Sequence, residues 1–328
     1  MSRPRILMTG ASGFVGGHLI QALRERLPDA EICATAPRPK AMPGGSRLDQ
    51  LDVTNAATVK AVIGRFQPTH IVHLAGLSTL AAAAADYLAT WQVHVFGTLS
   101  IANAILDIAP DCVLLFVGSG EVYGASARSG LPLDETTVLA PLSEYAATKA
   151  AADLALGAMT QRGLRSIRLR PFNHTGPGQS DRFVIPSFAK QIAGIETGML
   201  PPVLKVGNLE AERDFLDVRD IIDAYVSAIE ASDHLPAGVI LNIASGVPVR
   251  IRDLLDKLLA LSKCGIRIEQ DTARMRVNDT PRYVGDAARA RHLLNWSPRY
   301  QTDEMLSSVL NSFRGIAQTP ATILYRKK

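Results

Sequence analysis

The segment RILMTGASGFVG, residues 5–16, decides the fold. It begins as a short apolar strand and leads into a predicted helix over Gly13–Arg26. Between the two, the spacing is G-x-x-G-x-x-G rather than the more common G-x-G-x-x-G. We predict that Gly10 permits a tight turn, that Gly13 lets the backbone approach a pyrophosphate, and that Gly16 allows the helix and the strand to pack closely. The predicted dinucleotide cradle, at a helix N-terminus, consists of Gly10, Ser12, Gly13, Phe14, Val15 and Gly16.

Short apolar runs alternate with helical patterns through the first half of the chain, which is typical of a parallel sheet wound by crossover helices. After Pro171, prolines and longer loops become more frequent. We therefore predict an α/β fold, with a Rossmann-like doubly wound domain over residues 1–170 and a smaller C-terminal α/β substrate lobe over 171–328. Segments near 217–243 are expected to return to the sheet. The predicted strands of the first domain are Arg5–Thr9, Glu31–Ala36, Arg47–Leu51, His70–Leu74, Cys112–Gly118 and Ser166–Arg170.

The composition excludes several classes of protein. The 35 basic and 31 acidic residues give a net charge of +4 without a dense basic block, so we expect no nucleic-acid partner. The apolar stretches are shorter than the roughly 18 residues of a membrane helix, and a signal-peptide pattern is lacking. We therefore expect no membrane partner and a cytoplasmic location. Cys33, Cys112 and Cys264 stand singly, and His70 and His73 lack a third ligand nearby, so we expect no metal site.

The end of the second predicted strand indicates which dinucleotide binds. NAD-binding proteins of this type place a carboxylate there, but Ala34–Arg38 contains no acid. Because Arg38 can pair with a 2′-phosphate, we expect NADP(H) to be preferred, with NAD(H) possible. Asp52, followed by Val53, stands where an acid can bind the adenine amino group. The alternative for Asp52 is a helix cap before Asn55.

Tyr145 and Lys149 stand four residues apart in a predicted helix and therefore share one face. A nearby cation favours phenolate, so we expect the pKa of Tyr145 to lie below its usual value of about 10. Such a phenol can pass a proton to or from a carbonyl or an alcohol. On spacing alone, a surface Tyr–Lys pair is the alternative. Ser119 follows an apolar strand, where such folds bind ligands, and its hydroxyl can hold the substrate oxygen.

Four motifs together resemble the extended short-chain dehydrogenase/reductase family: TGASGFVG, HLAG at 73–76, Ser119 followed by VYG, and YAATK at 145–149. The resemblance covers nearly the whole chain. It implies that Lys149 also holds the nicotinamide ribose and that Phe172 lines the nicotinamide. The resemblance also implies that Leu74, Ala75 and Gly76 of the HLAG motif contact the cofactor. One departure is His94, where this family usually carries Asn.

The second lobe is similar to the sugar-nucleotide enzymes of that family. The run from Arg170 to Gln179 resembles their substrate-pyrophosphate loop, with Asn173 as a donor. The segment at 207–215 is similar to one shared by enzymes that act on GDP-mannose derivatives, where Arg213 would contact the diphosphate. Arg276 matches a nucleotide-binding arginine, and Asp279 would bind the ribose hydroxyls. Each arginine alone is equally consistent with a structural surface residue.

The residues after Ser119 separate two reactions of this group. Its dehydratases need a proton donor and a base before the V-Y-G turn, and this chain keeps Glu121 but has Gly120 in the donor position. The run from Arg170 to Asp220 most resembles members that reduce GDP-4-dehydro-6-deoxy-D-mannose to GDP-D-rhamnose. We expect that C4 ketone reduction, with a GDP-sugar bound at Ser119 and Glu121. The alternatives are a GDP-mannose 4,6-dehydratase, an NAD-dependent 4-epimerase and a non-catalytic dinucleotide sensor.

A predicted helix over Tyr87–Ile108 carries apolar residues on nearly every side. A helix on a sheet needs only one apolar stripe, so a second face is expected to be buried. The alanine-rich helix Tyr145–Met159 can pack closely beside it. We therefore expect a homodimer, the alternative being burial within one subunit.

Overall fold

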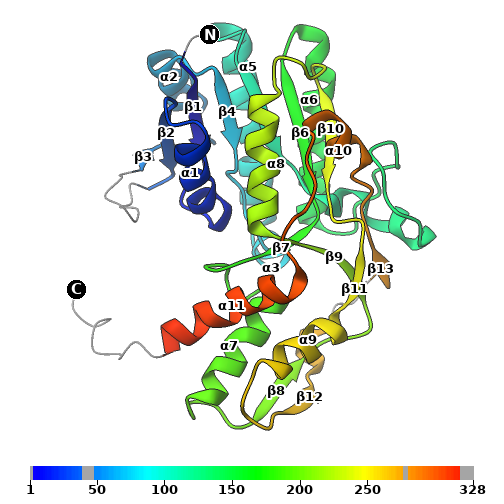
Figure 1. Ribbon diagram of the computed structural model, residues 1–328. Helices are drawn as coiled ribbons and strands as arrows, with labels where there is room; N and C mark the ends of the chain where they lie inside the picture. Colours follow the sequence, from blue (N-terminus) through cyan, green and yellow to red (C-terminus); the bar gives the residue numbers. More distant parts are fainter. Residues whose placement is uncertain (1–2, 39–47, 276–279, 318–328) are drawn as a thin grey trace.

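The computed structural model describes residues 3–38, 48–275 and 280–317. Its largest sheet has the strand order β10-β6-β5-β4-β1-β2-β3, and every pairing in it is parallel. From β1 the chain adds β2 and β3 on one side of the sheet and β4, β5, β6 and β10 on the other. The topological switch point, where the direction of winding reverses, therefore lies between β1 and β4. The predicted doubly wound fold is therefore confirmed (Figure 1). The strands are β1 (Arg5–Thr9), β2 (Glu31–Ala36), β3 (Asp49–Gln50), β4 (His70–His73), β5 (Val113–Val117), β6 (Ser166–Pro171) and β10 (Val239–Ile243).

Helices cover both faces of this sheet, which explains why the central strand β5, Val113–Val117, is apolar throughout. In β1, Ile6 and Met8 pack toward one face and Leu7 toward the other. The first face carries α1 (Phe14–Arg26) and α8 (Val218–Glu230), which lie side by side in Figure 1. The opposite face carries α2 (Ala56–Phe66), α5 (Gly97–Ile108) and α6 (Glu144–Met159). As expected from 217–243, α8 and β10 return the chain to the sheet.

A smaller group of elements lies below the carboxyl ends of the strands in Figure 1. Its core consists of residues of α7, α9 and α11 with β8. These elements are α7 (Val184–Glu196), β8 (Val203–Val206), α9 (Ile251–Ala260), β12 (Arg267–Gln270) and α11 (Thr302–Ala317). Between them and the main sheet stand β7 (Asn173–Thr175), β9 (Glu212–Asp217), β11 (Pro248–Arg250) and β13 (Arg282–Tyr283). The remaining helices are α3 (Leu80–Ala85), α4 (Tyr87–Trp91), α10 (Ala288–Leu294) and the 3₁₀ segments Gly120–Ser129, Thr160–Arg162 and Thr272–Arg274.

The predicted helix Tyr87–Ile108 is helical throughout, but it is not one α-helix. A π-helical segment, Gln92–Phe96, separates α4 from α5. A π-turn contains one extra residue, which rotates the side chains that follow it to another face of the helix. Counting apolar residues along the sequence does not detect this rotation. Tyr87, Leu88 and Phe96 are 55%, 63% and 52% exposed, so the part of the chain that the structure describes does not cover these side chains.

A buried ion cluster fixes α6 to the sheet. Asp153, 0% exposed, accepts hydrogen bonds from Arg168 at 2.9 Å and from Arg170 at 2.9 and 3.0 Å. Arg170 also donates to the Tyr123 hydroxyl at 2.9 Å, which donates to Asn242 of β10 at 2.7 Å. The cluster thus joins α6, β6, the 3₁₀ segment and β10.

Replacing Asp153 by Asn should therefore destabilise the fold strongly. The substitution leaves two guanidinium groups without their buried counter-charge, which typically costs about 3–5 kcal/mol. Urea denaturation of the purified variant measures the free energy of unfolding. Asp107→Asn, which removes the exposed partner of Lys60, is the control and should leave that free energy nearly unchanged. Equal stability of the two variants would contradict the role of the cluster.

Candidate active site

A cleft of about 1600 Å³ opens at the carboxyl ends of β1, β4, β5 and β6, facing the smaller lobe. Most residues predicted for the site line it: Gly10, Ser12, Gly13, Phe14, Val15, Gly16, Asp52, Val53, Leu74, Ala75, Gly76, Ser119, Glu121, Tyr145, Lys149, Phe172, Asn173 and Arg213. Arg38 is exposed and is not part of the wall. Arg276 and Asp279 lie outside the described residues.

The glycine-rich loop has the geometry of a phosphate cradle. Gly10 has a φ of +67°, and a Cβ there would stand 2.6 Å from the backbone nitrogen of Ala75. A Cβ at Gly16 would stand 2.4 Å from the carbonyl oxygen of Ala11. Glycine is therefore required at both positions. Because α1 begins at Phe14 with its N-terminus at the cleft, its free N–H groups suit a pyrophosphate.

The turn after β3 forms part of the cleft wall. Asp52 lines the wall, and one of its oxygens accepts hydrogen bonds from the backbone and hydroxyl of Thr54 at 2.9 and 2.8 Å. Asn55, and not Asp52, caps α2 by accepting from Thr58 at 3.0 Å. The helix-cap alternative for Asp52 is therefore wrong, since this residue closes a turn at the cleft.

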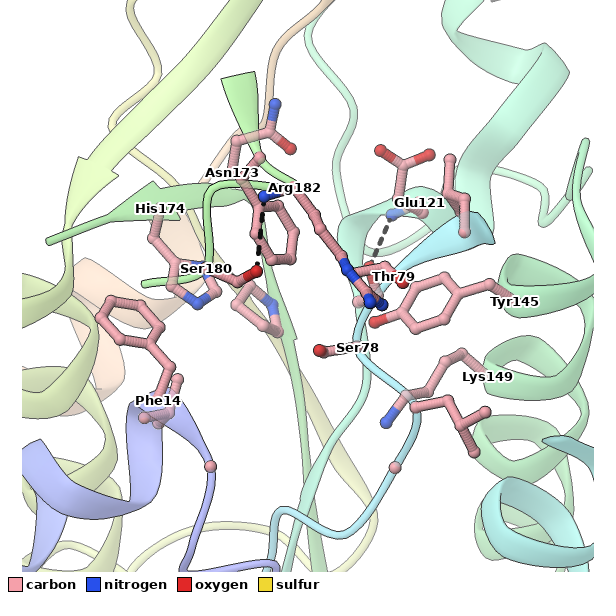
Figure 2. A pocket seen from close by; sticks show the side chains of 18 of the residues that line it. Phe14, Ser78, Thr79, Glu121, Tyr145, Lys149, Asn173, His174, Ser180 and Arg182 are labelled. Atoms are coloured by element: carbon pink, nitrogen blue, oxygen red, sulfur yellow. Dashed lines mark hydrogen bonds between the residues drawn. The ribbon is translucent and has the colours of Figure 1, made fainter. Parts of the chain in front are cut away.

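Tyr145 and Lys149 lie on the cleft-facing side of α6, whose first turn is capped by Ser143 (Figure 2). Burial raises the pKa of Tyr145 to about 12, and the negative charge of Glu121 adds to the rise, while a hydrogen bond with Ser119 opposes it. The expected lowering of this pKa by Lys149 is therefore wrong. Burial also lowers the pKa of Lys149 to about 8, and its ammonium donates to the carbonyl of Val117 at 2.9 Å. The phenol thus remains a proton donor at neutral pH.

Ser119 stands directly after β5, next to the phenol. Its hydroxyl oxygen accepts a hydrogen bond from the backbone of Glu121 at 3.1 Å and so caps the 3₁₀ segment (Figure 2). The same hydroxyl also forms a hydrogen bond with the Tyr145 phenol. The two hydroxyl groups therefore lie together, and a ligand oxygen that reaches them could accept from both.

Gly120 is enclosed by the ring of Phe172. A Cβ at Gly120 would stand 2.9 Å from that ring, and a Cβ at Gly285 would stand 2.6 Å from it on another side. The hydroxyl of Tyr283 donates to the Gly120 carbonyl at 2.7 Å and closes the region further. A side chain at position 120 would require the ring to move, so the site holds no proton donor there.

His94, the departure from the family pattern, lies in the π-helical segment and is 1% exposed. Its Nε2 accepts from the backbone N–H of Leu77 at 2.8 Å, so its Nδ1 carries the proton and donates to Thr148 at 2.8 Å. Thr148 in turn donates to the Tyr145 carbonyl at 2.9 Å. The imidazole also meets the Tyr145 ring edge-on, with centroids 5.6 Å apart. His94 therefore joins the loop after β4 to the first turn of α6.

A second buried histidine supports this network. His73 Nδ1 lies 2.7 Å from the Thr9 hydroxyl, and its Nε2 lies 3.0 Å from the Thr98 hydroxyl. Thr98 donates to the His94 carbonyl at 2.5 Å. Burial, reinforced by the charge of Lys149, lowers the pKa of both His73 and His94 to about 3. Both rings are thus neutral and act as fixed hydrogen-bonding groups.

The opposite wall comes from β7 and β9 of the smaller lobe. Asn173 and Arg213 line the cleft from these strands. Beside them, His174 stacks on Phe14, with ring centroids 6.3 Å apart and an interplanar angle of 10° (Figure 2). The Phe14 ring therefore connects the cradle with the substrate lobe in addition to lining the cleft.

Several residues of the wall were not predicted as site residues. Ser78 and Thr79 follow HLAG at the carboxyl end of β4, which is a position that could have indicated them. Arg182, in a loop, and Arg274, at the end of a 3₁₀ segment, also line the cleft, but neither belongs to a recognisable motif. Within the described residues, no group of three or more His, Cys, Asp or Glu side chains is placed to hold a metal ion, and no helix is long and apolar enough to cross a bilayer.

Comparisons with known proteins agree with this geometry. The model of the NAD dependent epimerase/dehydratase family matches residues 6–244. The chain is 35% identical over 311 residues to GDP-6-deoxy-D-mannose reductase of Pseudomonas aeruginosa, covering 94% of this chain and 97% of that protein. It is 27% identical to GDP-6-deoxy-D-talose 4-dehydrogenase of Aggregatibacter actinomycetemcomitans, covering 90% and 93%.

The structure is similar to that of RMD from Pseudomonas aeruginosa complexed with NADPH, with a TM-score of 0.83 at 30% identity. That comparison covers 95% of this chain and 99% of the other. The glycine cradle, the Tyr145–Lys149 pair and the fold thus agree with the family match. The chain therefore belongs to the NAD dependent epimerase/dehydratase family and is an oxidoreductase with the extended short-chain dehydrogenase/reductase fold.

Proposed function

We propose that the protein reduces the C4 ketone of GDP-4-dehydro-6-deoxy-D-mannose to GDP-D-rhamnose with NADPH. The observation that carries the proposal is the pairing of a protonated Tyr145 with Ser119 at a cleft that has no proton donor at position 120. The 35% identity to a GDP-6-deoxy-D-mannose reductase supports the same substrate.

The residues of α6 and β5 account for the proton side of this reaction. A bound nicotinamide cofactor supplies hydride chemistry at C4. Tyr145 donates its proton to the ketone oxygen, which becomes the C4 hydroxyl. Ser119 donates a hydrogen bond to the same oxygen as negative charge develops on it. Lys149 orients the nicotinamide ribose, and its positive charge favours the phenolate that Tyr145 becomes after the transfer.

The rival reactions of this family fit the site less well. A 4,6-dehydratase needs a base, such as Glu121, and also a proton donor for the departing 6-hydroxyl. The donor position is Gly120 in this chain, and the Phe172 ring fills the space that a side chain there would need. A 4-epimerase regenerates its own cofactor and so must first oxidise C4. An epimerase of this kind keeps NAD bound, and the end of β2, Ala34–Arg38, lacks the carboxylate that NAD-binding proteins of this type place there.

The cofactor proposed is NADP(H), with NAD(H) also accepted. The cradle at Gly10–Gly16 fits a dinucleotide pyrophosphate, and Arg38 follows β2 where no carboxylate stands. The related RMD structure contains NADPH. Asp52 and Val53 would border the adenine, and Leu74–Gly76 and Phe172 would border the rest of the cofactor.

The proposed GDP-sugar site combines Ser119 and Glu121 with residues of the smaller lobe. Asn173 and Arg213 project from the lobe wall and would hold the diphosphate. Arg276 and Asp279 remain predicted contacts of the nucleotide, outside the described residues.

We also propose a homodimer formed through α4, the π-helical segment and α6. Tyr87, Leu88 and Phe96 are exposed on the first two, and Leu154 is 60% exposed on α6, which packs against α4. Large apolar side chains gathered on adjacent helices favour an interface.

Incubation with GDP-4-dehydro-6-deoxy-D-mannose tests the reaction. The wild-type protein should consume NADPH, and NADH more slowly, and form GDP-D-rhamnose. Absorbance at the nicotinamide band measures cofactor consumption, and chromatography identifies the product. Tyr145→Phe should lose most turnover while binding NADPH normally. Absence of cofactor consumption by the wild type, or full activity of the variant, would defeat the proposal.

Replacing His94 should lower kcat without changing the pH dependence of the reaction between pH 5 and 8. His94→Ala loses the hydrogen bonds to Leu77 and Thr148, and kcat should fall about tenfold because the position of Tyr145 is loosened. His94→Asn can restore one of these bonds and should recover part of the activity. Since the pKa of His94 is about 3, the pH profile between pH 5 and 8 should keep its shape. Loss of an inflection near neutrality would instead show that His94 itself titrates during turnover.

Charged substitutions in the apolar helices should produce monomers. The double change Leu88→Glu with Leu154→Glu places two carboxylates in the proposed interface, and light scattering during gel filtration measures the mass. Leu131→Glu, at a side chain that is 70% exposed outside these helices, is the matched control and should leave the dimer intact. A wild-type protein that elutes as a monomer would refute this interface.

A further inference from the structure

Arg182 stands in the loop between β7 and α7, and it lines the cleft. Figure 2 shows its side chain extending from this loop into the cleft, toward Thr79 and Tyr145. The residue belongs to the smaller lobe, whereas Tyr145 belongs to α6. Arg182 therefore reaches across the cleft from the lobe wall toward the catalytic wall.

The loop directs Arg182 inward by local hydrogen bonds. The backbone N–H of Arg182 donates to the Ser180 hydroxyl at 3.3 Å, and that of Phe183 donates to the Ser180 carbonyl at 3.2 Å. The side chain of Asp181 turns the other way and binds Lys190 of α7 at 2.5 Å. Because Asp181 is held by Lys190, the nearest carboxylate in the sequence is not the partner of Arg182.

No described side chain neutralises the Arg182 guanidinium. The cleft wall contains the carboxylates of Asp52, Glu121 and Glu144, yet Arg182 makes no ion pair with any residue in the described ranges. Most other arginines of the structure have a carboxylate partner, such as the pairing of Arg219 with Asp217 at 2.8 Å. Arg182 is solvent-exposed, so water solvates its charge in the free protein, and a guanidinium that extends into a binding cleft without a counter-charge is available to an anionic ligand.

The placement of Arg182 distinguishes between the two diphosphates that the proposed function brings into the cleft. The cofactor diphosphate has its own cradle at Gly10–Gly16 and the N-terminus of α1. Arg182 projects from the opposite wall, which it shares with Arg213 and Arg274. Since Arg182 extends toward Tyr145, where the sugar reacts, the phosphate nearest to it is the one joined to the sugar.

We infer that Arg182 binds the distal phosphate of the sugar nucleotide, the phosphate that carries the sugar. This inference rests on the proposed function, because it takes a nucleoside diphosphate sugar as the substrate. The planar guanidinium makes two parallel hydrogen bonds to phosphate oxygens. Arg182 thereby sets the distance between the diphosphate and the reacting carbon, and it selects diphosphate nucleotides over monophosphates.

Calorimetric binding of GDP, GMP and NADPH to Arg182→Gln tests the inference without turnover. The dissociation constant of GDP should rise about ten- to a hundredfold. GMP lacks the distal phosphate, and NADPH has its own cradle, so their dissociation constants should not change. Arg182→Lys keeps the charge but loses the two-pronged geometry and should give an intermediate loss. Arg128→Gln removes an equal charge from an exposed position outside the cleft and should change none of the three constants.

Three outcomes would overturn the inference. Unchanged GDP affinity in Arg182→Gln shows that the residue binds no phosphate. A loss for NADPH alone assigns it to the cofactor, and equal losses for GDP and GMP assign it to the rest of the nucleotide. A wild-type protein that binds UDP over GDP contradicts the proposed GDP-sugar substrate instead, and the same comparison with UDP and UMP then tests Arg182 separately.

Discussion

The side chain of Asp153 accepts hydrogen bonds from Arg168 and Arg170 in the interior, and the position of the catalytic helix depends on this cluster. Asp153 lies one helical turn after Lys149 on α6, and both arginines belong to β6. The end of β6 leads directly into Phe172 and the lobe wall. One buried carboxylate thus relates the helix of the proposed proton donor to the wall proposed to bind the sugar nucleotide. A buried ion pair adds little net stability, but it disfavours other arrangements of its partners.

The same low-polarity environment sets the protonation of the catalytic pair. Burial penalises the charged form of each group, so the pKa of Tyr145 rises to about 12 and that of Lys149 falls to about 8. Both shifts have the same cause, because burial favours the uncharged phenol and the uncharged amine. The phenol therefore carries its proton in the free protein, as the proposed acid role requires, and an amine with a pKa of about 8 is still mostly charged at neutral pH. His73 and His94 are held neutral by the same burial, so they contribute fixed hydrogen bonds near the donor.

Local patterns in the sequence were sufficient for the doubly wound parallel fold, the glycine-rich turn and the shared helix face of Tyr145 and Lys149, because each is expressed in residues close together in the chain. Contacts between distant segments were not predictable in this way. The hydrogen bond between His94 and Thr148 joins residues 54 apart, and the π-turn that positions His94 has no periodic signature. The sign of the Tyr145 pKa shift was wrong for the same reason. The spacing of Tyr145 and Lys149 shows that a cation stands near the phenol, whereas the burial of the phenol depends on how distant segments of the chain pack.

The two walls of the cleft offer groups of different physical kinds to an anion. The cradle offers backbone N–H groups at the start of α1, and glycine is fixed at Gly10 and Gly16 because a Cβ would clash with the backbone. The lobe wall offers long arginine side chains, Arg182 and Arg213 among them. Backbone donors are pre-ordered and give a rigid seat, which suits a ligand whose reactive ring must be placed reproducibly. Binding of a phosphate by Arg182 would restrict a long side chain, so part of the binding free energy would offset its lost side-chain entropy. In the proposed reaction this cost would moderate the affinity for substrate and product, which leave at every turnover.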